Sequence, residues 1–530
     1  MSAKHPYKEL LQVEVGSIQR YIFEGRRLRE IRGASALLDA ANRLDVPRII
    51  SQNVGDVADV LRSTGSVTIL GIRPEAAESQ LESLAHAIRK LYHETVPGAV
   101  CHMARVNCSD QPLQASLRAL SYAVASGEGQ APATDPDVAL MEPIVRFCDS
   151  CGYRPPVRVM VVGGDGELLC NVCHTKAQYG IRVRGFEAKG SMIQRFAQFA
   201  EGRPGWDDVD LASVMPDDLS DVAGDEQVAL ILTDGNRLGQ SLRLLETVEQ
   251  YREFSAGVAR VVEQATFEAL AAHPPQATNG SAVLPWEILF LGGDDVLIAT
   301  RSTIALAVAQ ALMEGVEKHS ADLFRALGLD GGEESAGRDF LSMATGVAVG
   351  PSSYPFRALH DLAGQLERTA KTRAYTAWEQ EGKEASTIDF HRITASGRTQ
   401  IERVRSTEQR PRRTGGQERI QLTQRPFVRS EMDEVMAVAR YWKQHVPNTK
   451  VHYLRDRLFV SPAETARGWA HVVGRARPDE RKALLDLHTL EEPEGASPPA
   501  PAPWHERSQT VTTWSTYLLD IIETHELLPG

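Results

Sequence analysis

The stretch Trp286–Thr300, WEILFLGGDDVLIAT, decides the fold of this chain. Two short apolar runs, Ile288–Leu291 and Val296–Ala299, flank two glycines and two aspartates, which we call the GGDD turn (Gly292–Asp295). Short apolar runs separated by a glycine-rich turn are typical of a β-hairpin. We therefore expect a hairpin that carries two carboxylates at its tip.

The two aspartates of this turn, Asp294 and Asp295, suggest a metal site. Adjacent carboxylates repel one another unless a cation lies between them, and a divalent metal ion is the usual one. Gly292 and Gly293 have no side chains, so a phosphate or a nucleotide can approach their backbone closely. A solvated Gly-Asp turn is the alternative, and for the turn taken alone it is the commoner case.

The composition excludes several classes of protein. A chain of 530 residues, 42% hydrophobic and 24% charged, is long enough for three or four globular domains. No apolar run approaches the roughly 20 residues of a membrane span, and the N-terminal residues lack a signal-peptide core. We expect a cytoplasmic protein with no membrane partner. The formal net charge of −12 means that nucleic-acid contacts would need local basic patches or a partner subunit.

The N-terminal residues are expected to form a small antiparallel sheet covered by helices. Strands are expected at residues 7–15, 66–72 and 100–106, and helices at 17–44, 74–93 and 113–125. The first helix carries a basic face of Arg20, Arg26, Arg27, Arg29 and Arg32. Such a face is commonly solvated, and contact with a phosphate backbone is the alternative.

Four cysteines lie in two Cys-x-x-Cys pairs, CDSC (Cys148 and Cys151) and CNVC (Cys170 and Cys173), with eighteen residues between the pairs. This spacing places four thiolates in reach of one tetrahedral Zn²⁺ ion, as in a zinc ribbon. Because all four ligands are cysteine, no position stays open for a substrate water. We expect a structural zinc site. An acidic, Pro- and Gly-rich connecting loop is expected at residues 201–225.

A second sheet-and-helix unit is expected to begin near Gln227. Its first strand, Val228–Thr233, runs directly into Asp234, Gly235 and Asn236, and Gly239 follows. Around the hairpin, helices are expected at 238–272 (broken near 250), 303–327 and 356–380, and strands at 341–349 and 386–393. The order β-α-β-β-α-β, with an extra helix, is the ferredoxin-like arrangement.

In that arrangement the first strand lies beside the hairpin. We therefore expect Asp234 to converge with Asp294 and Asp295 at one edge of the sheet. Three carboxylates aimed at one point fit two Mg²⁺ or Mn²⁺ ions in a phosphoryl-transfer site. The combination is more specific than either motif alone.

The N-terminal unit resembles an internal repeat of this pattern, because EVGSIQRYI echoes LTDGNRLGQ. In this pairing Val15 stands where Asp234 would be, and Thr64–Ser66 stand where the GGDD turn would be. The first copy is expected to have the same fold without its metal ligands.

The C-terminal part divides into two segments. Residues 398–429 are rich in arginine and are either a disordered connector or a mobile RNA-contacting loop. The remainder is expected to be a small helical bundle, with helices at 431–445, 462–474, 478–487 and 510–525 and a Pro/Ala-rich insert at 491–503.

In combination these features resemble the large polymerase/cyclase subunit of type III CRISPR effector complexes. The stretches that carry the resemblance are IQRYIFEGRRLREIRGAS (Ile18–Ser35), LTDGNRLG (Leu232–Gly239), LFLGGDDVLIA (Leu289–Ala299), MATGVAVG (Met343–Gly350) with a helix containing Ala370 and Lys371, and QRPF (Gln424–Phe427).

The resemblance implies a mixed α+β chain of four parts. These are a non-catalytic palm-like domain (1–135), a zinc module with a linker (136–225), a catalytic palm (226–397) and an Arg-rich loop with a C-terminal helical domain (398–530). Many relatives carry an N-terminal HD-type nuclease domain, whereas this chain begins at the first palm, so we expect no such domain. Asn236 stands where relatives often have aspartate.

The resemblance also implies the activity, a metal-dependent nucleotidyltransferase that makes cyclic oligoadenylate from ATP in antiviral defence. The implied partners are guide RNA, target RNA, a small helical subunit and backbone subunits. The implied catalytic residues are Asp234, Asp294 and Asp295. The implied nucleotide-binding residues are Gly235, Asn236, Gly239, Gly292, Gly293 and Lys371.

Three alternatives remain open. The same site could make another nucleotide signal, such as an AMP conjugate or a cyclic dinucleotide. A stand-alone GGDEF-like or adenylate-type cyclase would use similar carboxylates without needing a duplicated palm or a zinc module. A catalytically silent RNA-binding scaffold subunit is the third. Base choice, ring size and activator are not encoded in any motif above.

Overall fold

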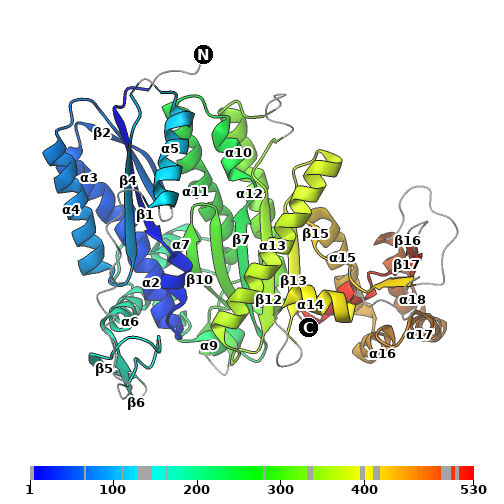
Figure 1. Cartoon of the computed structure of the whole chain (residues 1–530). Coiled ribbons are helices and arrows are strands. Elements are labelled where there is room, and N and C mark those ends of the chain that lie inside the picture. Colours follow the sequence, from blue (N-terminus) through cyan, green and yellow to red (C-terminus); the bar gives the residue numbers. More distant parts are fainter. Residues whose placement is uncertain are drawn as a thin grey trace. The chain divides into compact units, whose positions relative to one another are not determined.

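The computed structural model describes residues 5–64, 67–109, 111–127, 146–162, 165–278, 281–330, 338–393, 400–409, 418–490, 503–507 and 512–529. Figure 1 labels the helices and strands of the chain. The chain divides into two compact units. The first consists of Met1–Gly224, Arg237–Ala299 and Glu314–Leu341, and the second of Asp225–Asn236, Thr300–Met313 and Ser342–Gly530.

The first unit begins with a four-stranded antiparallel sheet in the order β2-β3-β1-β4. Its strands are β1 (Glu9–Gly16), β2 (Ala58–Thr64), β3 (Val67–Ile72) and β4 (Val100–Asn107), and its helices are α1 (Ile18–Phe23), α2 (Leu28–Ala40), a π-helical turn (Ala41–Asp45), α3 (Val46–Val54), α4 (Glu78–Thr95) and α5 (Leu113–Ser126). The predicted antiparallel sheet with helices is confirmed. The single helix expected at 17–44 is instead broken after Phe23.

The sequence prediction missed β2. Only Ala58 and Leu61 of this strand are buried, and its register shifts between Val60 and Arg62. A bulge of this kind breaks the alternation of apolar and polar residues that reveals a strand.

The elements that follow are β5 (Arg158–Val162), β6 (Asp165–Leu169), α6 (Asn171–Arg184), α7 (Met192–Ala200), α8 (Leu211–Val214) and α9 (Leu219–Ala223). Residues 201–225, expected to be a connecting loop, therefore contain two short helices. Their aspartates are N-caps, since Asp210 accepts from the N–H of Ala212 and Asp218 accepts from the N–H of Ser220. Acidic capping residues of this kind give a helical segment the composition of a loop.

The rest of the first unit is formed by α10 (Leu238–Arg243), α11 (Val248–Ala271), β8 (Gln276–Thr278), β9 (Ser281–Val283) and β10 (Trp286–Gly292). The chain passes into the second unit within β11 (Asp295–Arg301), and α12 (Ser302–Ala326) has residues in both units. At the start of β10, Trp286 packs against Phe196 with ring centroids 4.7 Å apart, and Trp206 and Phe267 complete the aromatic cluster.

The second unit contributes four strands to its larger sheet, β7 (Val228–Gly235), β12 (Met343–Gly350), β13 (Thr387–Arg392) and β15 (Phe427–Val428). β7 pairs antiparallel with β12, β12 pairs parallel with β13, and β13 pairs antiparallel with β15. Helix α13 (Phe356–Glu381) connects β12 to β13. The antiparallel pairing of β7 with β12 is the pairing expected for the first and last strands of a ferredoxin-like unit.

The C-terminal part contains α14 (Ile401–Val404), a π-helical turn (Arg405–Gln409), β14 (Glu418–Gln421), α15 (Arg429–His445), α16 (Asn448–Leu458), α17 (Pro462–Gly474), α18 (Pro478–Leu485), a 3₁₀ turn (Asp486–Leu490), β16 (His505–Arg507), β17 (Thr512–Ser515) and α19 (Leu518–Glu526). The expected helical domain is confirmed, but the helix expected at 510–525 begins as a strand. The RPRRTGG stretch and most of the Pro/Ala-rich insert lie outside the described residues.

Arg425 fastens this C-terminal part to the sheet of the second unit. Its side chain is fully buried, and it contacts Asp520 at 2.9 Å, Glu523 at 2.5 Å and the carbonyl of Phe390 at 2.8 Å. A guanidinium with its hydrogen bonds satisfied in this way ties α19 to β13 with fixed geometry.

Within the described residues, no helix combines the length and apolar character that a membrane span requires.

The connections from β1 to α1 and from β7 to α10, which resemble each other in sequence, share a backbone feature. Ser17 and Arg237 both adopt left-handed conformations, with φ of 53° and 52°, directly before α1 and α10. Counting back three residues from each turn pairs Glu14, not Val15, with Asp234. Counting back from the strand ends, Gly16 and Gly235, instead pairs Val15 with Asp234, so the pairing of the two copies stays a prediction.

Helices α2 and α6 cross in direct backbone contact. A Cβ atom on Gly33 would lie 1.8 Å from the carbonyl oxygen of Lys176, and one on Gly180 would lie 1.9 Å from that of Arg29. Only glycine fits at both positions of this crossing.

We predict that Gly33→Ala or Gly180→Ala lowers the free energy of unfolding by roughly 2–3 kcal/mol, because a methyl group would push the two backbones apart. Chemical denaturation followed by circular dichroism measures the effect. Gly185→Ala is the matched control, since Gly185 lies at the end of α6 and a Cβ there meets its first atom at 3.5 Å. Equal stability of all three variants would contradict the close crossing.

Candidate functional site

The GGDD turn forms the predicted hairpin tip. β10 ends at Gly292 and β11 begins at Asp295, so the turn itself is Gly293–Asp294. Gly293 has φ of 70°, a conformation that favours glycine, and a Cβ there would have Thr64 Oγ1 at 4.0 Å as its nearest neighbour. Asp294 is half-buried and Asp295 is exposed. The tip therefore offers two carboxylates and open space beside its glycines.

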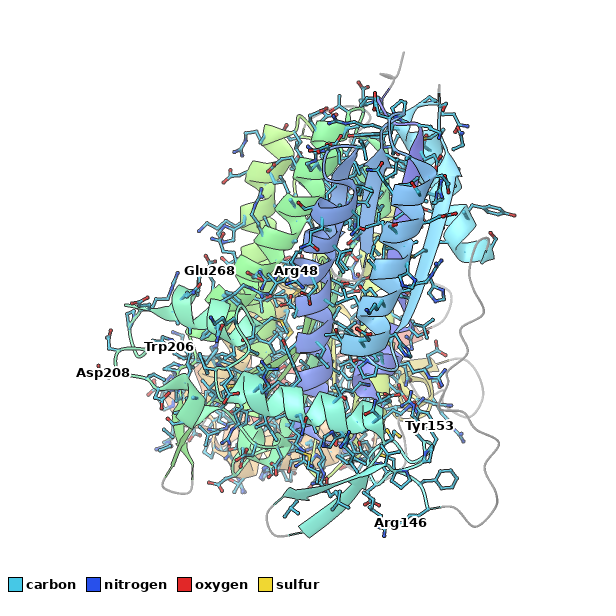
Figure 2. All side chains as sticks on the ribbon, turned by 90° about the vertical axis from the view of Figure 1, so that its left-hand side faces the viewer. Arg48, Arg146, Tyr153, Trp206, Asp208 and Glu268 are labelled. Atoms are coloured by element: carbon cyan, nitrogen blue, oxygen red, sulfur yellow. The ribbon has the colours of Figure 1, made fainter. Side chains whose placement is uncertain are left out.

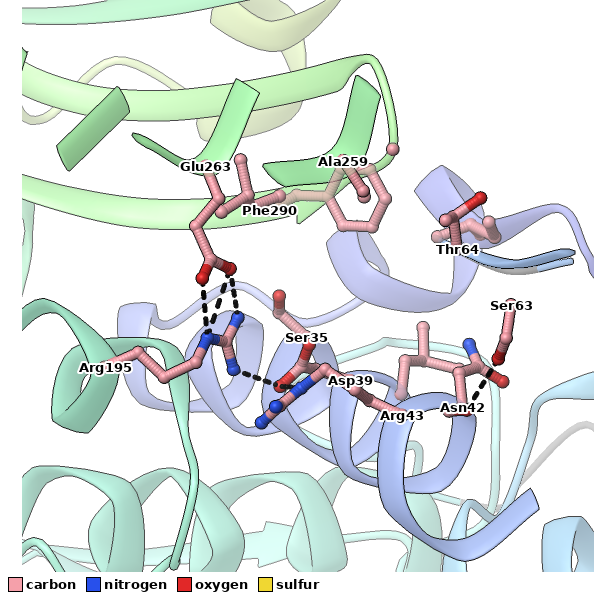
Figure 3. A pocket seen from close by; sticks show the side chains of 15 residues that line it. Ser35, Asp39, Asn42, Arg43, Ser63, Thr64, Arg195, Ala259, Glu263 and Phe290 are labelled. Atoms are coloured by element: carbon pink, nitrogen blue, oxygen red, sulfur yellow. Dashed lines mark hydrogen bonds and ion pairs between the residues drawn. The ribbon is translucent and has the colours of Figure 1, made fainter. Parts of the chain in front are cut away.

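A pocket lies against this hairpin in the first unit (Figure 3). Its apolar wall includes Phe290, and its polar side chains come from α2, the adjoining π-helical turn, β2, α7 and α11. The polar lining comprises Ser35, Asp39, Asn42, Arg43, Ser63, Thr64, Arg195 and Glu263, and the backbone of Gly292 and Gly293 closes the pocket on the hairpin side.

Arg195 organises the polar side of the pocket. It contacts Glu263 at 2.8 Å and Asp39 at 3.0 Å (Figure 3). It also donates to the carbonyl of Gly190 at 2.9 Å. Burial opposes the charge of Arg195, but the two carboxylates outweigh it and raise the pKa of the guanidinium. One cation thus joins α7 to α2 and α11 and fixes the pocket wall. Sequence reasoning missed these residues, because each lies on a different helix and none belongs to a motif.

Asp234 and Lys371 lie together in the second unit. Asp234 is the seventh residue of β7, opposite Ala344 of β12, and its carboxylate pairs with the ammonium group of Lys371 on α13. Lys371 also lies 3.7 Å from Glu367. Burial opposes the charge of Lys371, yet the hydrogen bond with Asp234 and the charges of Asp234 and Glu367 raise its pKa. Lys371 is therefore a paired residue and not a solvated helix lysine.

Gly346 explains how α13 comes close enough for this pair to form. A Cβ on Gly346 of β12 would lie 2.3 Å from the carbonyl oxygen of Ala363 and 2.4 Å from the N–H nitrogen of Glu367. The helix backbone therefore rests on the strand backbone, one turn before Lys371.

Asn236, which stands where relatives often have aspartate, makes hydrogen bonds that favour asparagine at this position. Its side-chain amide donates to Ser342 Oγ at 2.9 Å, and its backbone N–H donates to the carbonyl of Ser342 at 2.8 Å. The Ser342 hydroxyl in turn donates to Glu384. An aspartate would bring a second carboxylate to a buried position beside Glu384, whereas asparagine supplies the donor that this chain of hydrogen bonds needs.

The two remaining glycines of the predicted site differ in their surroundings. Gly235 is buried at the end of β7, opposite Met343. Gly239 lies in α10, where a Cβ would meet nothing within 4 Å.

The pair of Asp234 and Lys371 belongs to the second unit and the GGDD turn to the first, so the convergence of the three aspartates stays a prediction.

The four cysteines of the two knuckles come together as expected. The Sγ atoms of Cys148, Cys151, Cys170 and Cys173 all lie within 4.8 Å of one another. Three of the four residues are buried, and the backbone N–H of Cys173 donates to Cys170 Sγ. Four clustered thiol ligands without a carboxylate or water position suit tetrahedral Zn²⁺. The donor set fits a structural zinc ion.

Charged residues attach this zinc module (residues 146–184) to α1. Lys176, which is fully buried, contacts Glu24 at 2.5 Å, and Arg154 contacts the same carboxylate at 3.0 Å. The hydroxyl of Tyr153 also donates to Glu24. Figure 2 labels Tyr153 and Arg146 at the end of the unit where β5 and β6 lie.

Of the basic face predicted on the first helix, Arg20, Arg26 and Arg27 are exposed to solvent, whereas Arg29 is half-buried and Arg32 is buried. Arg29 pairs with Glu167 of β6 at 2.5 Å, and Arg27 pairs with the same carboxylate. Arg32 is buried against Glu287 of β10 at 2.6 Å. These arginines join elements within the unit.

We predict that the purified protein contains one zinc ion per chain and that Cys173→Ser loses it. Removal of one thiolate from a four-cysteine site lowers metal affinity strongly, because the remaining three ligands leave the coordination incomplete. Metal analysis by inductively coupled plasma mass spectrometry measures the content. Cys101→Ser is the control, since Cys101 lies on β4 outside the cluster. Equal zinc content in the Cys173→Ser variant would contradict the assignment.

Comparison with known proteins agrees with this architecture. Residues 227–377 match the family described as Cas10/Cmr2, second palm domain. The resemblance drawn from the GGDD hairpin and the Asp234 strand end is therefore confirmed over these residues. No curated protein sequence matches the chain.

One solved structure shares the fold at low identity, and others are similar to this chain. A structure of the Csm1–Csm4 cassette in complex with cA4 matches at 12% identity and a TM-score of 0.50, over 91% of this chain and 69% of that chain. Csm1 in T. onnurineus matches at 13% identity and a TM-score of 0.47, over 92% and 64%. The cassette in complex with pppApA matches at 12% identity and a TM-score of 0.43. The match covers 70% of this chain and 53% of that chain, so this chain spans about half of that one.

Proposed function

We propose that this protein is a nucleotidyltransferase of the type III CRISPR kind that makes cyclic oligoadenylate from ATP. The observation that carries the proposal is the Cas10/Cmr2 palm match over residues 227–377, which includes Asp234, the GGDD turn and Lys371. Structures of similar fold have been solved with cA4 and AMPPNP, which supports an adenine nucleotide as substrate.

In this proposal Asp234, Asp294 and Asp295 hold two Mg²⁺ or Mn²⁺ ions, which when bound polarise phosphate oxygens and lower the pKa of a coordinated hydroxyl. The chain itself positions the nucleotide. Gly293 and its neighbour Gly292 leave room for the triphosphate, and the pocket beside them offers hydroxyl, amide and carboxylate groups to a ribose or base. Lys371 supplies positive charge and orients the Asp234 carboxylate.

The proposed setting is a multi-subunit complex with guide RNA, target RNA, a small helical subunit and backbone subunits. The similar structures of Csm1 bound to Csm4 support such partners. Production of the messenger would then depend on target RNA.

The test is product formation by the purified protein, with Mg²⁺ or Mn²⁺ and each NTP, alone and with its RNA-guided complex. We expect mass spectrometry to find cyclic oligoadenylate from ATP. We expect Asp294→Asn/Asp295→Asn to lower its formation at least about 1,000-fold, because the site loses two anionic ligands.

Asp322→Asn is the matched control, because Asp322 is an 80% exposed carboxylate on α12. If a product of a different mass forms and also disappears in the GGDD variant, the catalytic site is supported but the product is another nucleotide signal. Normal binding of guide RNA with no turnover under any activator would favour the scaffold alternative.

Lys371 gives a separate prediction. We expect Lys371→Met to lower product formation roughly 10- to 100-fold, because both the orientation of Asp234 and a positive charge are lost. Lys318→Met, an exposed lysine on α12, should have no effect. If Lys371 only competes with metal for Asp234, the variant would instead need less Mg²⁺ for half-maximal rate and would show no loss of maximal rate.

A further inference from the structure

Helix α2 lies between the zinc module and the hairpin that carries the GGDD turn. On one side, Glu30 accepts a hydrogen bond from Ser150, which stands between Cys148 and Cys151. The same carboxylate accepts from the backbone N–H of Arg26 at 3.1 Å. The first cysteine knuckle is thereby bonded to the N-terminal turn of α2.

The second knuckle reaches the same side of α2 through α6. Cys170 is the N-cap of α6 and Cys173 lies in its first turn. Further along α6, the backbone at Lys176 and Gly180 rests on α2 at Gly33, with no room for a methyl group on either helix. A backbone contact has no side chain that can yield, so a displacement of α6 must displace α2 as well.

The opposite side of α2 holds β10. Arg32 follows Glu30 by two positions, so it leaves the helix in a different direction. Its guanidinium donates to the two carboxylate oxygens of Glu287 at 2.6 and 3.1 Å and to the carbonyl of Pro216 at 2.7 Å. Both side chains of the pair are buried, with 4% and 6% of their surface exposed.

Glu287 is the second residue of β10, the strand that ends in the GGDD turn. A bidentate pair fixes both the distance and the orientation of its partners, and breaking it would leave a buried charge without compensation. One and two turns further along α2, Ser35 and Asp39 line the pocket beside Gly292 and Gly293. The position of α2 therefore sets both the strand that carries the turn and the wall facing it.

We propose that α2 couples the zinc module to the GGDD hairpin, with Arg32 and Glu287 as the positioning pair. The folded, metal-loaded module holds α2 in place through Glu30 and Gly33, and α2 holds β10 through Arg32. The consequence for turnover rests on the proposed function, whereas the coupling itself does not.

Hydrogen–deuterium exchange of the full-length protein, followed by mass spectrometry, tests the coupling without an activity readout. We compare the zinc-loaded protein with protein stripped by a chelator. Exchange is expected to rise about tenfold in peptides of α6, α2 and β10 alike, because local opening then needs less free energy. Peptides of β4 and of α16–α17 should keep their rates and serve as internal references.

Glu287→Gln tests the pair from the other end. This variant is expected to keep its zinc and the exchange rates of α6 while β10 exchanges several-fold faster, because Arg32 loses its anionic partner. Arg32→Lys, which keeps the charge but loses the fork, should show a smaller increase of the same pattern. Arg73→Gln breaks an exposed ion pair of the same unit, with Asp59, and should leave β10 unchanged.

The proposal fails if stripping the metal speeds exchange in α6 but leaves β10 at its original rate. It also fails if β4 accelerates equally, since that pattern means general unfolding of the unit. Absence of a nucleotide product would contradict the proposed function but would not affect the exchange result. Product formation together with uncoupled exchange would contradict only the coupling through α2.

Discussion

The contact between the backbones of Gly33 and Gly180 is the constraint on which the first unit depends. Side chains can adjust by changing rotamer, but two helices that meet through carbonyl oxygen and Cα atoms have one allowed separation. The zinc module lies on one side of this crossing, and Arg32 and the wall of the pocket lie on the other. In the proposed coupling, the four cysteines act on the rest of the unit through this rigid crossing.

Arginine joins the elements of this acidic chain. Arg32 connects α2 to β10, Arg154 connects the zinc module to α1, Arg195 connects α7 to α11, and Arg425 connects β13 to α19. A guanidinium can donate in a planar fork while its stem packs against apolar surface, so one residue can fix two or three elements. In the segment that looks basic in sequence, Arg27, Arg29 and Arg32 are accordingly paired with carboxylates of other elements.

The sequence was informative where a pattern is local. The hairpin at Gly292–Asp295, the four-cysteine cluster and most strands and helices follow from periodicity and spacing within a few residues. It was uninformative where a bulge disturbs the alternation, as in β2, or where capping aspartates resemble a loop, as before α8. The trio of Asp39, Arg195 and Glu263 could not be predicted, because its members meet only after three separate helices have packed. The partner of Lys371 was equally hidden, since it depends on Gly346 admitting α13 close to β12.

The left-handed residues Ser17 and Arg237 allow the ends of β1 and β7 to be compared. Both strands place a carboxylate three residues before this turn, Glu14 in the first and Asp234 in the second. Glu14 accepts from Gln12 at 2.7 Å, a neutral donor, whereas Asp234 is paired with the cation Lys371. Under the proposed function, a single strand-end carboxylate is therefore not enough to mark a phosphoryl-transfer site. Adjacent carboxylates on a glycine turn are the scarcer feature, because their mutual repulsion is unfavourable unless a cation compensates it. The capacity to hold two divalent ions is thus expected to depend on the hairpin tip more than on the strand end.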